Sequence, residues 1–309
     1  MTKAMATRDA YGEALKELGK LNKNIVVLDA DLSKSTKTIV FKEEFPERFF
    51  DVGISEQNLM GIAAGLSTCG KIPFASTFAM FATGRAYEII RNSICYPKLN
   101  VKIAATHAGL TVGEDGATHQ AIEDLSLMRS IPNMVVLNPA DGVEARQCIF
   151  KAAEHKGPVY IRLGRSKVPT IFDDSYKFEI GKGVELKKGK DVTIIATGIM
   201  VEKALKAGEM LEKEGISPRI IDISTIKPID KDIIIKAAKE TKKIITAEEH
   251  SIIGGLGSAV AEVLSENYPV LLSRIGVEDT FGESGTVDDV LEKYGLTAEN
   301  IYNRVKKII

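Results

Sequence analysis

The 309-residue sequence has no tryptophan and only three cysteines, Cys69, Cys95 and Cys148. These cysteines show no CxxC spacing, which argues against a disulfide framework and against a zinc site. No apolar run approaches the roughly 20 residues needed to span a bilayer, and the first residues lack the apolar segment of a signal peptide. The formal net charge of −1 provides no field that would attract nucleic acid or a membrane surface. We therefore expect a cytoplasmic protein that binds neither.

Short apolar segments alternate with helical patterns along the chain, and the length allows about two domains. Near-continuous apolar strands separated by helices are typical of a mostly parallel sheet covered on both faces. The expected strands of the first domain are Ile25–Leu28, Phe49–Val52, Ile72–Ser76, Val101–Ala105, Met134–Leu137 and Val159–Leu163. Its expected helices are Thr7–Leu21, Glu56–Thr68, Gly84–Ile94, Ile122–Met128 and Gly142–Glu154.

A polar, turn-rich segment at Pro169–Lys190 reads as a linker. A second alternation follows it, with expected helices at Val201–Glu214, Lys231–Thr241 and Gly257–Glu266. The sequence therefore predicts an α/β protein with two parallel-sheet domains, residues 1–185 and residues 190–309.

Glu56 and two phenylalanines follow expected strand ends, where open α/β sheets bind ligands. Glu56 could simply complement the dipole of the helix that it begins. That helix, however, is apolar and small-sided, so we expect it to be buried, and a buried carboxyl can share a proton with a ring nitrogen. Phe78 and Phe81 could fill the core or form a stacking wall for a flat heterocycle.

The segment THAGLTVGEDGATHQ has no helix or strand period, and its glycines allow the backbone to approach a ligand closely. It contains His107, Glu114, Asp115 and His119. Metal ligation by these residues is one interpretation, although the spacing is loose and no HExxH or similar pair occurs. Hydrogen bonding to a polyol or proton transfer is the favoured interpretation.

Basic and hydroxyl side chains complete the candidate site. Arg165 lies beyond an expected strand, Arg8 begins the first helix, and Ser35 is on another loop. Each could be a solvated surface group, but arginine also binds phosphate with two parallel hydrogen bonds. Gly254–Gly257 resembles part of a dinucleotide-binding motif, but its third glycine is missing and its strand is displaced, so we discount it.

Several segments, in order, resemble the C-terminal half of transketolase, a thiamine-diphosphate enzyme of the pentose phosphate pathway. The most specific are GISEQNLMGIAAGL, STFAMFATGRAYEIIR and THAGLTVGEDGATHQAIEDLSLMRSIPNMVVLNPADG. TIKPID and AEEHSIIGGLGSAV extend the resemblance into the second domain. The resemblance implies a pyrimidine-binding domain followed by a transketolase C-terminal domain.

The resemblance also implies roles for residues at the cofactor. Glu56 would hydrogen-bond N1′ of the aminopyrimidine and so favour the tautomer that removes the thiazolium proton. Phe78 and Phe81 would pack on the pyrimidine, and His119 would lie near the 4′-amino group and the reacting carbons. Gly84 stands where some members place another aromatic residue, so stacking could be thinner here or be supplied by a side chain such as Tyr87.

At the sugar, the resemblance implies that His107 and Asp115 bind hydroxyl groups. Arg8, Ser35 and Arg165 would hold the sugar phosphate at the mouth of the cleft. His107 and His119, with Glu56, are thus the expected catalytic residues, and the sequence predicts no metal ligands.

Full-length transketolases carry an N-terminal half with a GDG…N unit that holds Mg²⁺ and the diphosphate, and this sequence contains no such unit. We therefore expect the chain to be inactive alone and to work with an N-terminal transketolase subunit in an α₂β₂ assembly, with two copies of this chain paired. Three alternatives stay open: the β chain of a 2-oxoacid dehydrogenase, a deoxyxylulose-phosphate synthase fragment, and a non-catalytic assembly subunit. His250 is a further candidate that we interpret as structural.

Overall fold

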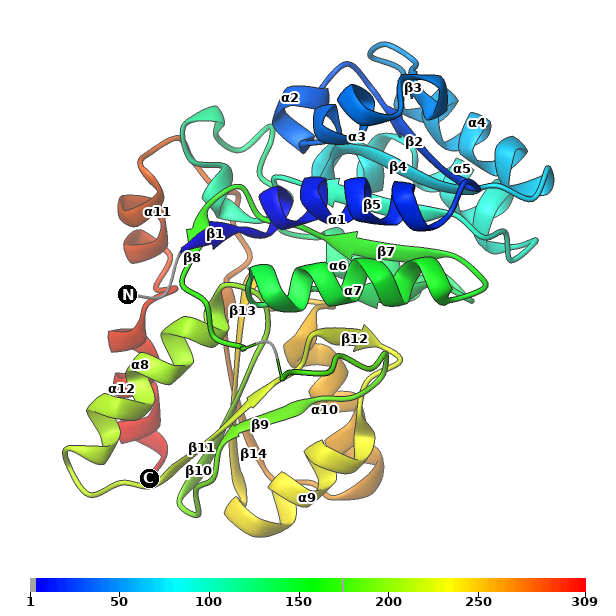
Figure 1. Cartoon of the computed structure of the whole chain (residues 1–309). Helices are drawn as coiled ribbons and strands as arrows, with labels where there is room; N and C mark the ends of the chain where they lie inside the picture. Colours follow the sequence, from blue (N-terminus) through cyan, green and yellow to red (C-terminus); the bar gives the residue numbers. More distant parts are fainter. Residues whose placement is uncertain (1–3, 174) are drawn as a thin grey trace.

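The computed structural model describes residues 4–173 and 175–309 and contains two large sheets, one above the other in Figure 1. The larger sheet has the strand order β12-β6-β7-β5-β4-β2-β3 and the smaller one β14-β13-β10-β11-β9. Most neighbouring strands in both are parallel, which confirms the predicted fold class; β12 and β9 are antiparallel edge strands.

The strands of the larger sheet are β2 (Ile25–Asp29), β3 (Phe49–Asp51), β4 (Ile72–Phe78), β5 (Lys102–Thr106), β6 (Val135–Leu137), β7 (Val159–Arg162) and β12 (Thr225–Lys227). Those of the smaller sheet are β9 (Val184–Lys187), β10 (Val192–Ala196), β11 (Pro218–Asp222), β13 (Lys243–Ser251) and β14 (Leu271–Val277). A short antiparallel pair joins β1 (Met5–Ala6) to β8 (Lys167–Val168).

The helices of the first domain are α1 (Thr7–Leu21), α2 (Ser33–Thr36), α3 (Ile39–Glu44), α4 (Glu56–Thr68), α5 (Tyr87–Ile89), α6 (Asp124–Ser130) and α7 (Gly142–Glu154). Those of the second are α8 (Met200–Glu212), α9 (Lys231–Thr241), α10 (Leu256–Asn267), α11 (Val287–Lys293) and α12 (Ala298–Ile308). Among the described residues, no helix combines the length and the apolar character needed to cross a membrane.

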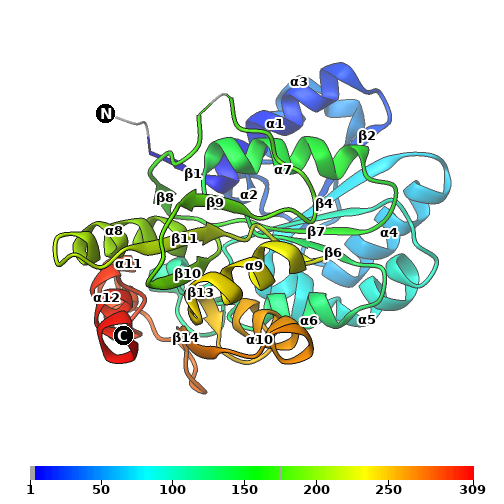
Figure 2. The ribbon, with the colours of Figure 1, turned by 90° about the horizontal axis from the view of Figure 1, so that it is seen from below.

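Alternation along buried strands explains how both faces of the larger sheet are covered. In β2, Ile25 and Val27 pack in the cluster that includes α1 and α7, whereas Val26 and Leu28 pack with α4 and α6. The smaller sheet is covered in the same way, by α8 and α12 on one face and α9 and α10 on the other (Figure 2). Both sheets are therefore buried on both faces.

One expected helix, Gly84–Ile94, has a different form in the structure. Wide π-helical turns at η2 (Phe81–Arg85) and η3 (Ile90–Cys95) flank the short helix α5. A π turn accommodates one more residue than an α turn, and such turns concentrate at functional sites. The sequence pattern carries no signal that separates them from an ordinary helix.

The junction between the domains is closely interwoven. The segment expected to be a linker contains β9, so Val184 and Glu185 already belong to the smaller sheet, paired with β11. Conversely, β12 comes from the second half of the sequence but belongs to the larger sheet, where it pairs with β6. The backbone N–H of Ser251 also donates to the carbonyl of Ile122 over 2.7 Å. The two sheets are thus joined by strands as well as by packing.

Candidate active site

The predicted site residues gather at the carboxyl edge of the larger sheet. Ser35 lies in α2 after β2, and Glu56 is the first residue of α4 after β3. Phe78 ends β4, His107 follows β5, and Arg165 follows β7. Because these strands are parallel, their carboxyl ends share one edge, as the sequence predicts.

Four rings form an aromatic cluster: Phe78, Phe81, His107 and His119. The rings of Phe78 and His107 stack with centroids 3.9 Å apart, and those of Phe78 and Phe81 lie 6.0 Å apart and nearly parallel. The ring of His119 meets Phe81 edge-on at 5.2 Å. Phe78 and His107 are buried, whereas Phe81 and His119 are half-buried. The cluster therefore presents aromatic surface at the edge of the sheet.

His107 is held neutral by its surroundings. Its Nε2 lies 2.9 Å from Nη1 of Arg8, which can only donate, so Nδ1 carries the hydrogen and donates to the hydroxyl of Thr106 at 2.8 Å. Burial, and then the charges of Arg8 and Arg165, lower the pKa of His107 to about 3. The residue also has a positive φ of 59°, which marks a constrained backbone.

Two arginines make the surroundings of His107 electropositive. Nη1 of Arg8 donates to the carbonyl of Ser35 over 3.0 Å, and Nη1 of Arg165 donates to the carbonyl of Val112. Burial is the main cause that lowers the pKa of Arg8, and Arg165 adds to it. Nε of Arg8 is buried and has no hydrogen-bond partner among the described residues. An anionic group would satisfy this donor and relieve the repulsion between the two guanidinium groups.

Asp115 lies at the end of the 3-10 segment η4 (Leu110–Asp115) and is exposed, as is Glu114 beside it. The structure thus places Asp115 on the same loop as the carbonyl that Arg165 binds, but outside the aromatic cluster. Among the described residues, no group of three or more His, Cys, Asp and Glu side chains is arranged to hold a metal ion.

Glu56 is connected to the aromatic cluster through Arg85, a residue that sequence reasoning missed. Glu56 is only 2% exposed, and its Oε2 lies 2.8 Å from Nη1 of Arg85. The Arg85 guanidinium also lies 4.9 Å above the ring of Phe81. The spacing of four between Phe81 and Arg85 could have revealed this contact, because side chains four apart meet on a helical face.

The outer face of α4 is uncovered, contrary to the expectation that this small-sided helix is buried. Gly61 and Gly65 are exposed, and a Cβ added to either would meet no atom within 4 Å. Ile54, just before the helix, is 76% exposed, and Phe50 is 40% exposed. We call these four residues the α4 face. Exposed apolar surface of this kind is available for contact with a partner protein.

Comparisons with known proteins identify the family of this chain. The protein-family model for the transketolase pyrimidine-binding domain matches residues 3–170, and the model for the transketolase C-terminal domain matches residues 181–301. The chain belongs to the transketolase family. A protein of Methanocaldococcus jannaschii, provisionally named a transketolase C-terminal section, is 57% identical over 96% of this chain and 94% of its own length.

Two further relatives refine the position within the transketolase family. The 6-deoxy-6-sulfo-D-fructose transketolase subunit SqwH of Clostridium is 43% identical over 97% of this chain and 94% of its own length. A solved structure described as a split gene transketolase, inactive beta4 tetramer, is 64% identical, covers 98% of both chains and has a TM-score of 0.92. The chain therefore corresponds to a transketolase C-terminal section.

At Gly84, where the sequence resemblance raised the question of another aromatic residue, Tyr87 does not supply a ring to the aromatic cluster. The hydroxyl of Tyr87 lies 3.3 Å from that of Ser130 in α6, so Tyr87 packs toward that helix. Gly84 itself is an exposed member of the π turn η2. The aromatic cluster is therefore made by Phe78 and Phe81 with the two histidines.

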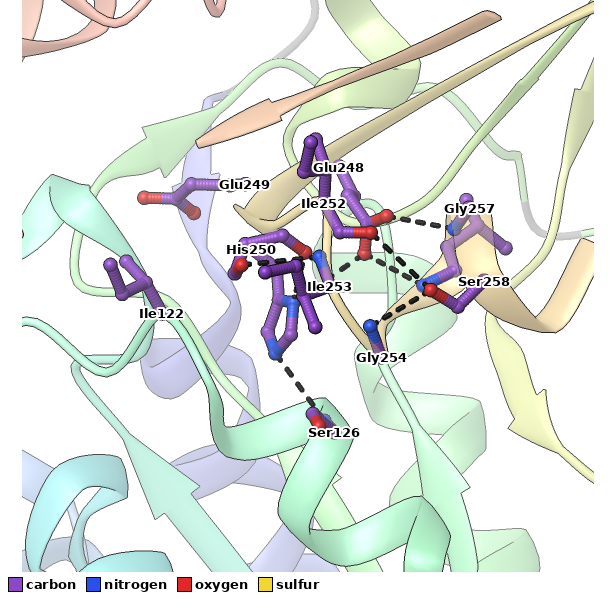
Figure 3. Close-up of polar contacts among 12 residues, drawn as sticks. Ile122, Ser126, Glu248, Glu249, His250, Ile252, Ile253, Gly254, Gly257 and Ser258 are labelled. Carbon is purple, nitrogen blue, oxygen red and sulfur yellow. Dashed lines mark hydrogen bonds and ion pairs between the residues drawn. The ribbon is translucent and has the colours of Figure 1, made fainter. Parts of the chain in front are cut away.

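Two backbone N–H groups of the Gly254–Gly257 motif are already bound by a carboxylate of the same chain, that of Glu248 (Figure 3). The carboxylate of Glu248 accepts the backbone N–H groups of Leu256 and Gly257, both over 2.7 Å, at the start of α10. The N-terminal end of α10, which could otherwise attract a phosphate, is thus already filled by Glu248.

His250 is fully buried in the same region. Its Nδ1 donates to the carbonyl of Ser251 over 2.7 Å, and its Nε2 accepts the N–H of Ser126 over 3.3 Å (Figure 3). Burial lowers the pKa of His250 to about 4, so the ring stays neutral. These contacts support a structural role for His250, whose side chain links β13 to α6.

The residues present fit one end of thiamine diphosphate. Its pyrimidine is a flat aromatic ring, for which Phe78 and Phe81 offer parallel ring faces. The buried carboxylate of Glu56 is an acceptor for a protonated ring nitrogen. For Mg²⁺ the described residues offer no ready ligand set.

Proposed function

We propose that this chain is the C-terminal subunit of a two-chain transketolase. With thiamine diphosphate and Mg²⁺, the assembly would transfer a two-carbon ketol unit from a ketose phosphate to an aldose phosphate. The observation that carries the proposal is the buried Glu56, joined by Arg85 to an aromatic cluster that includes two histidines.

In this proposal the cofactor supplies a nucleophilic carbon and an electron sink for breaking the bond beside a ketose carbonyl. Glu56 would accept a hydrogen bond from the protonated pyrimidine N1′, through the carboxylate oxygen that is now paired with Arg85. Because 52% of the Arg85 side chain is exposed, it can withdraw without disturbing the fold. Phe78 and Phe81 orient the ring and keep water from its face.

The histidines bind and orient the sugar. His107 is neutral, so its Nε2 can exchange Arg8 for a sugar hydroxyl donor, which leaves Arg8 free for an anion. Nδ1 of His119 is hydrogen-bonded to the hydroxyl of Thr118 at 2.9 Å, so Nε2 is the ring nitrogen that we propose for contact with the substrate. Asp115 accepts from a further hydroxyl.

Arg8 and Arg165 favour a substrate with an anionic end. The relative SqwH is named for a sulfonated sugar, whose end group is also an anion. Nε of Arg8, which has no hydrogen-bond partner among the described residues, is suited to a tetrahedral oxyanion, which either a phosphate or a sulfonate provides. We propose a sugar phosphate as the substrate.

The partner is proposed to supply the diphosphate and Mg²⁺ ligands in an α₂β₂ assembly with two copies of this chain. The α4 face supports this, because it begins beside Glu56 and is uncovered. A chain with 64% identity is described as an inactive β₄ tetramer, in keeping with a subunit that self-associates without its partner.

The decisive experiment reconstitutes this chain with an N-terminal transketolase subunit, thiamine diphosphate and Mg²⁺, and assays xylulose 5-phosphate with ribose 5-phosphate. We expect turnover by the pair, none by this chain alone, and a loss of at least about 100-fold in kcat for Glu56→Gln. Full activity of this chain alone would refute the two-chain proposal.

Two other outcomes would identify the alternatives. Turnover of pyruvate in place of the ketose would indicate a dehydrogenase or synthase subunit. A fully active Glu56→Gln complex would indicate a non-catalytic assembly subunit. Lys239→Gln on the exposed side of α9 is the matched control and should leave turnover unchanged.

A further inference from the structure

A carboxylate from the second domain holds the loop that follows His107. Oε1 of Glu249, near the end of β13, accepts the backbone N–H of Thr111 over 2.7 Å. Both residues are buried, with exposures of 3% and 1%. Thr111 lies midway between His107 and Asp115, four residues from each. We call residues 108–116 the sugar loop. The contact with Glu249 lies at the centre of this loop, next to the bond from Arg165 to the carbonyl of Val112, and so helps to set the distance between the two proposed sugar ligands.

Gly109 is shaped to receive this carboxylate. It has a φ of +80°, which favours glycine, and a Cβ at this position would collide with the carboxyl group of Glu249. Its N–H donates to the carbonyl of Ala121 over 2.8 Å, which closes the loop on itself. The sugar loop and Glu249 are thus fitted to each other, with no room for an alternative side chain.

The carboxylate of Glu249 is itself anchored. Nη2 of Arg162 donates to the carbonyl of Glu249 over 2.9 Å, and Nη1 lies 3.9 Å from its Oε2. Arg162 also makes two hydrogen bonds to Asp124, of 2.8 and 3.1 Å, which Tyr160 reinforces through its hydroxyl. Burial raises the pKa of Glu249, and the charge of Arg162 lowers it. A network shared by both domains therefore sets where the acceptor lies.

We propose that Glu249 is a positioning residue of the ketol transfer: through Thr111 it sets the sugar loop so that His107 and Asp115 bind the same substrate. This inference rests on the proposed function for its kinetic part. It gives the C-terminal domain a task in the active site without contact to the substrate. Misplacement of a binding loop by about 1 Å is enough to weaken productive binding strongly.

The neighbouring Glu248 provides a matched control. Figure 3 shows that the two carboxylates point to opposite sides of β13, Glu248 toward Gly257 and Glu249 away from it. Both are buried and both accept backbone N–H groups, but Glu248 caps α10 and not the sugar loop. Replacing either by alanine removes a comparable buried acceptor.

The first measurement is hydrogen–deuterium exchange of the free chain, which is independent of any activity. In Glu249→Ala we expect the amides of the sugar loop to exchange at least about 10-fold faster than in the wild type. Glu249→Gln keeps an acceptor oxygen and should restore most of the protection. Glu248→Ala should speed exchange at the start of α10 and leave the sugar loop unchanged. Equal protection of the loop in wild type and Glu249→Ala would overturn the proposal.

The second measurement uses the reconstituted two-chain enzyme. We expect Glu249→Ala to raise KM for the ketose phosphate about 10-fold with a change in kcat below about 3-fold, and Glu249→Gln to lie near the wild type. If Glu249→Ala changed kcat and KM by the same factors as Glu248→Ala does, Glu249 would have only a structural role. If the wild-type complex shows no ketol transfer, the proposed function fails while the exchange result still decides whether Glu249 holds the loop.

Discussion

Arg85 and Glu56 form an ion pair across the surface of the candidate site, with Nη1 and Oε2 2.8 Å apart. The arginine side chain is 52% exposed, whereas the glutamate side chain is 3% exposed. The pair thus joins an exposed cation to a buried carboxylate. A ligand that offers its own donor can replace Arg85 while Glu56 stays in place.

Arg85→Ala should destabilise the free chain, because it leaves a buried carboxylate without its cation. We expect the free energy of unfolding to fall by about 1–3 kcal/mol, the cost of an unsatisfied buried acceptor. Urea denaturation followed by circular dichroism measures this. Arg91→Ala is the control and should stay near the wild type, because this exposed arginine side chain donates only to Asn92 among the described residues. Equal stability of the two variants would contradict the importance of the pair.

His107 should not become protonated across the physiological pH range. Its pKa of about 3 lies below the ordinary 6.5, so at acid pH the unfolded chain takes up a proton that the folded chain refuses. This contribution to stability is complete above about pH 6.5 and is lost as the pH falls toward 3, by up to about 1.4 kcal/mol per pH unit. NMR titration of the ring should show no midpoint between pH 5 and 8.

Arg8→Gln tests the electrostatic part of this shift. The amide can still donate to Nε2, but the positive charge is gone, so the pKa of His107 should rise toward its ordinary value while burial keeps it low. A wild-type midpoint near 6.5 would contradict the lowered pKa of His107, and no change in the variant would show that the charge of Arg8 does not contribute to it.

Asp222→Asn should stabilise the protein at alkaline pH. Asp222 is fully buried, neither of its oxygens accepts a hydrogen bond from a described donor, and burial beside Glu144 raises its pKa well above 3.8. As the pH rises above 4, the unfolded state releases a proton that the folded state keeps, so stability falls. The variant removes this loss of stability. At pH 8 we expect its free energy of unfolding to exceed that of the wild type by at least about 1.4 kcal/mol, which corresponds to a pKa shift of one unit, and at pH 4 we expect little difference.

The control for this prediction is Asp141→Asn. Asp141 is equally buried, but its carboxylate accepts the N–H groups of Glu144 and Ile171, over 2.8 and 2.6 Å. We expect that variant to lose stability at both pH values. Denaturation curves at pH 4 and pH 8 separate the two cases, and a pH-independent effect of Asp222→Asn would contradict the raised pKa of Asp222.

Gly61→Gln should stabilise the free chain and weaken its assembly. The position is exposed inside α4 with open space around it, and replacing a helical glycine gains about 0.5–1 kcal/mol. The longer side chain would project from the α4 face, where we place the partner. Thermal denaturation measures the first effect, and size-exclusion chromatography of the mixed subunits measures the second. Unchanged association would remove the α4 face from the interface.

Elements with strong periodicity could be predicted from the sequence almost to the residue. The bounds of α1, α4, α7 and α9 agree with the expected helices. An aspartate at the N-cap accepts the backbone N–H of Glu144 in α7 and of Ile233 in α9. Aspartate is a preferred N-cap residue, so the sequence indicates where these helices begin. The position of the site followed from strand ends, because parallel strands bring them to one edge.

Contacts between distant segments could not be predicted in the same way. The π turns around α5 have the same apolar spacing as an ordinary helix, and the strand β9 lies in a polar segment that reads as a loop. The pairing of Arg85 with Glu56 depends on how α4 packs against η2, which no local pattern encodes.

The exchange of strands at the domain junction bears on how the chain can fold. Because β12, from the second half of the sequence, forms the edge of the first sheet, residues 1–185 alone would expose the unpaired edge of β6. An open strand edge is a template for aggregation. The two halves should therefore melt in a single cooperative transition, and neither is a separable module that could be transplanted without its neighbour.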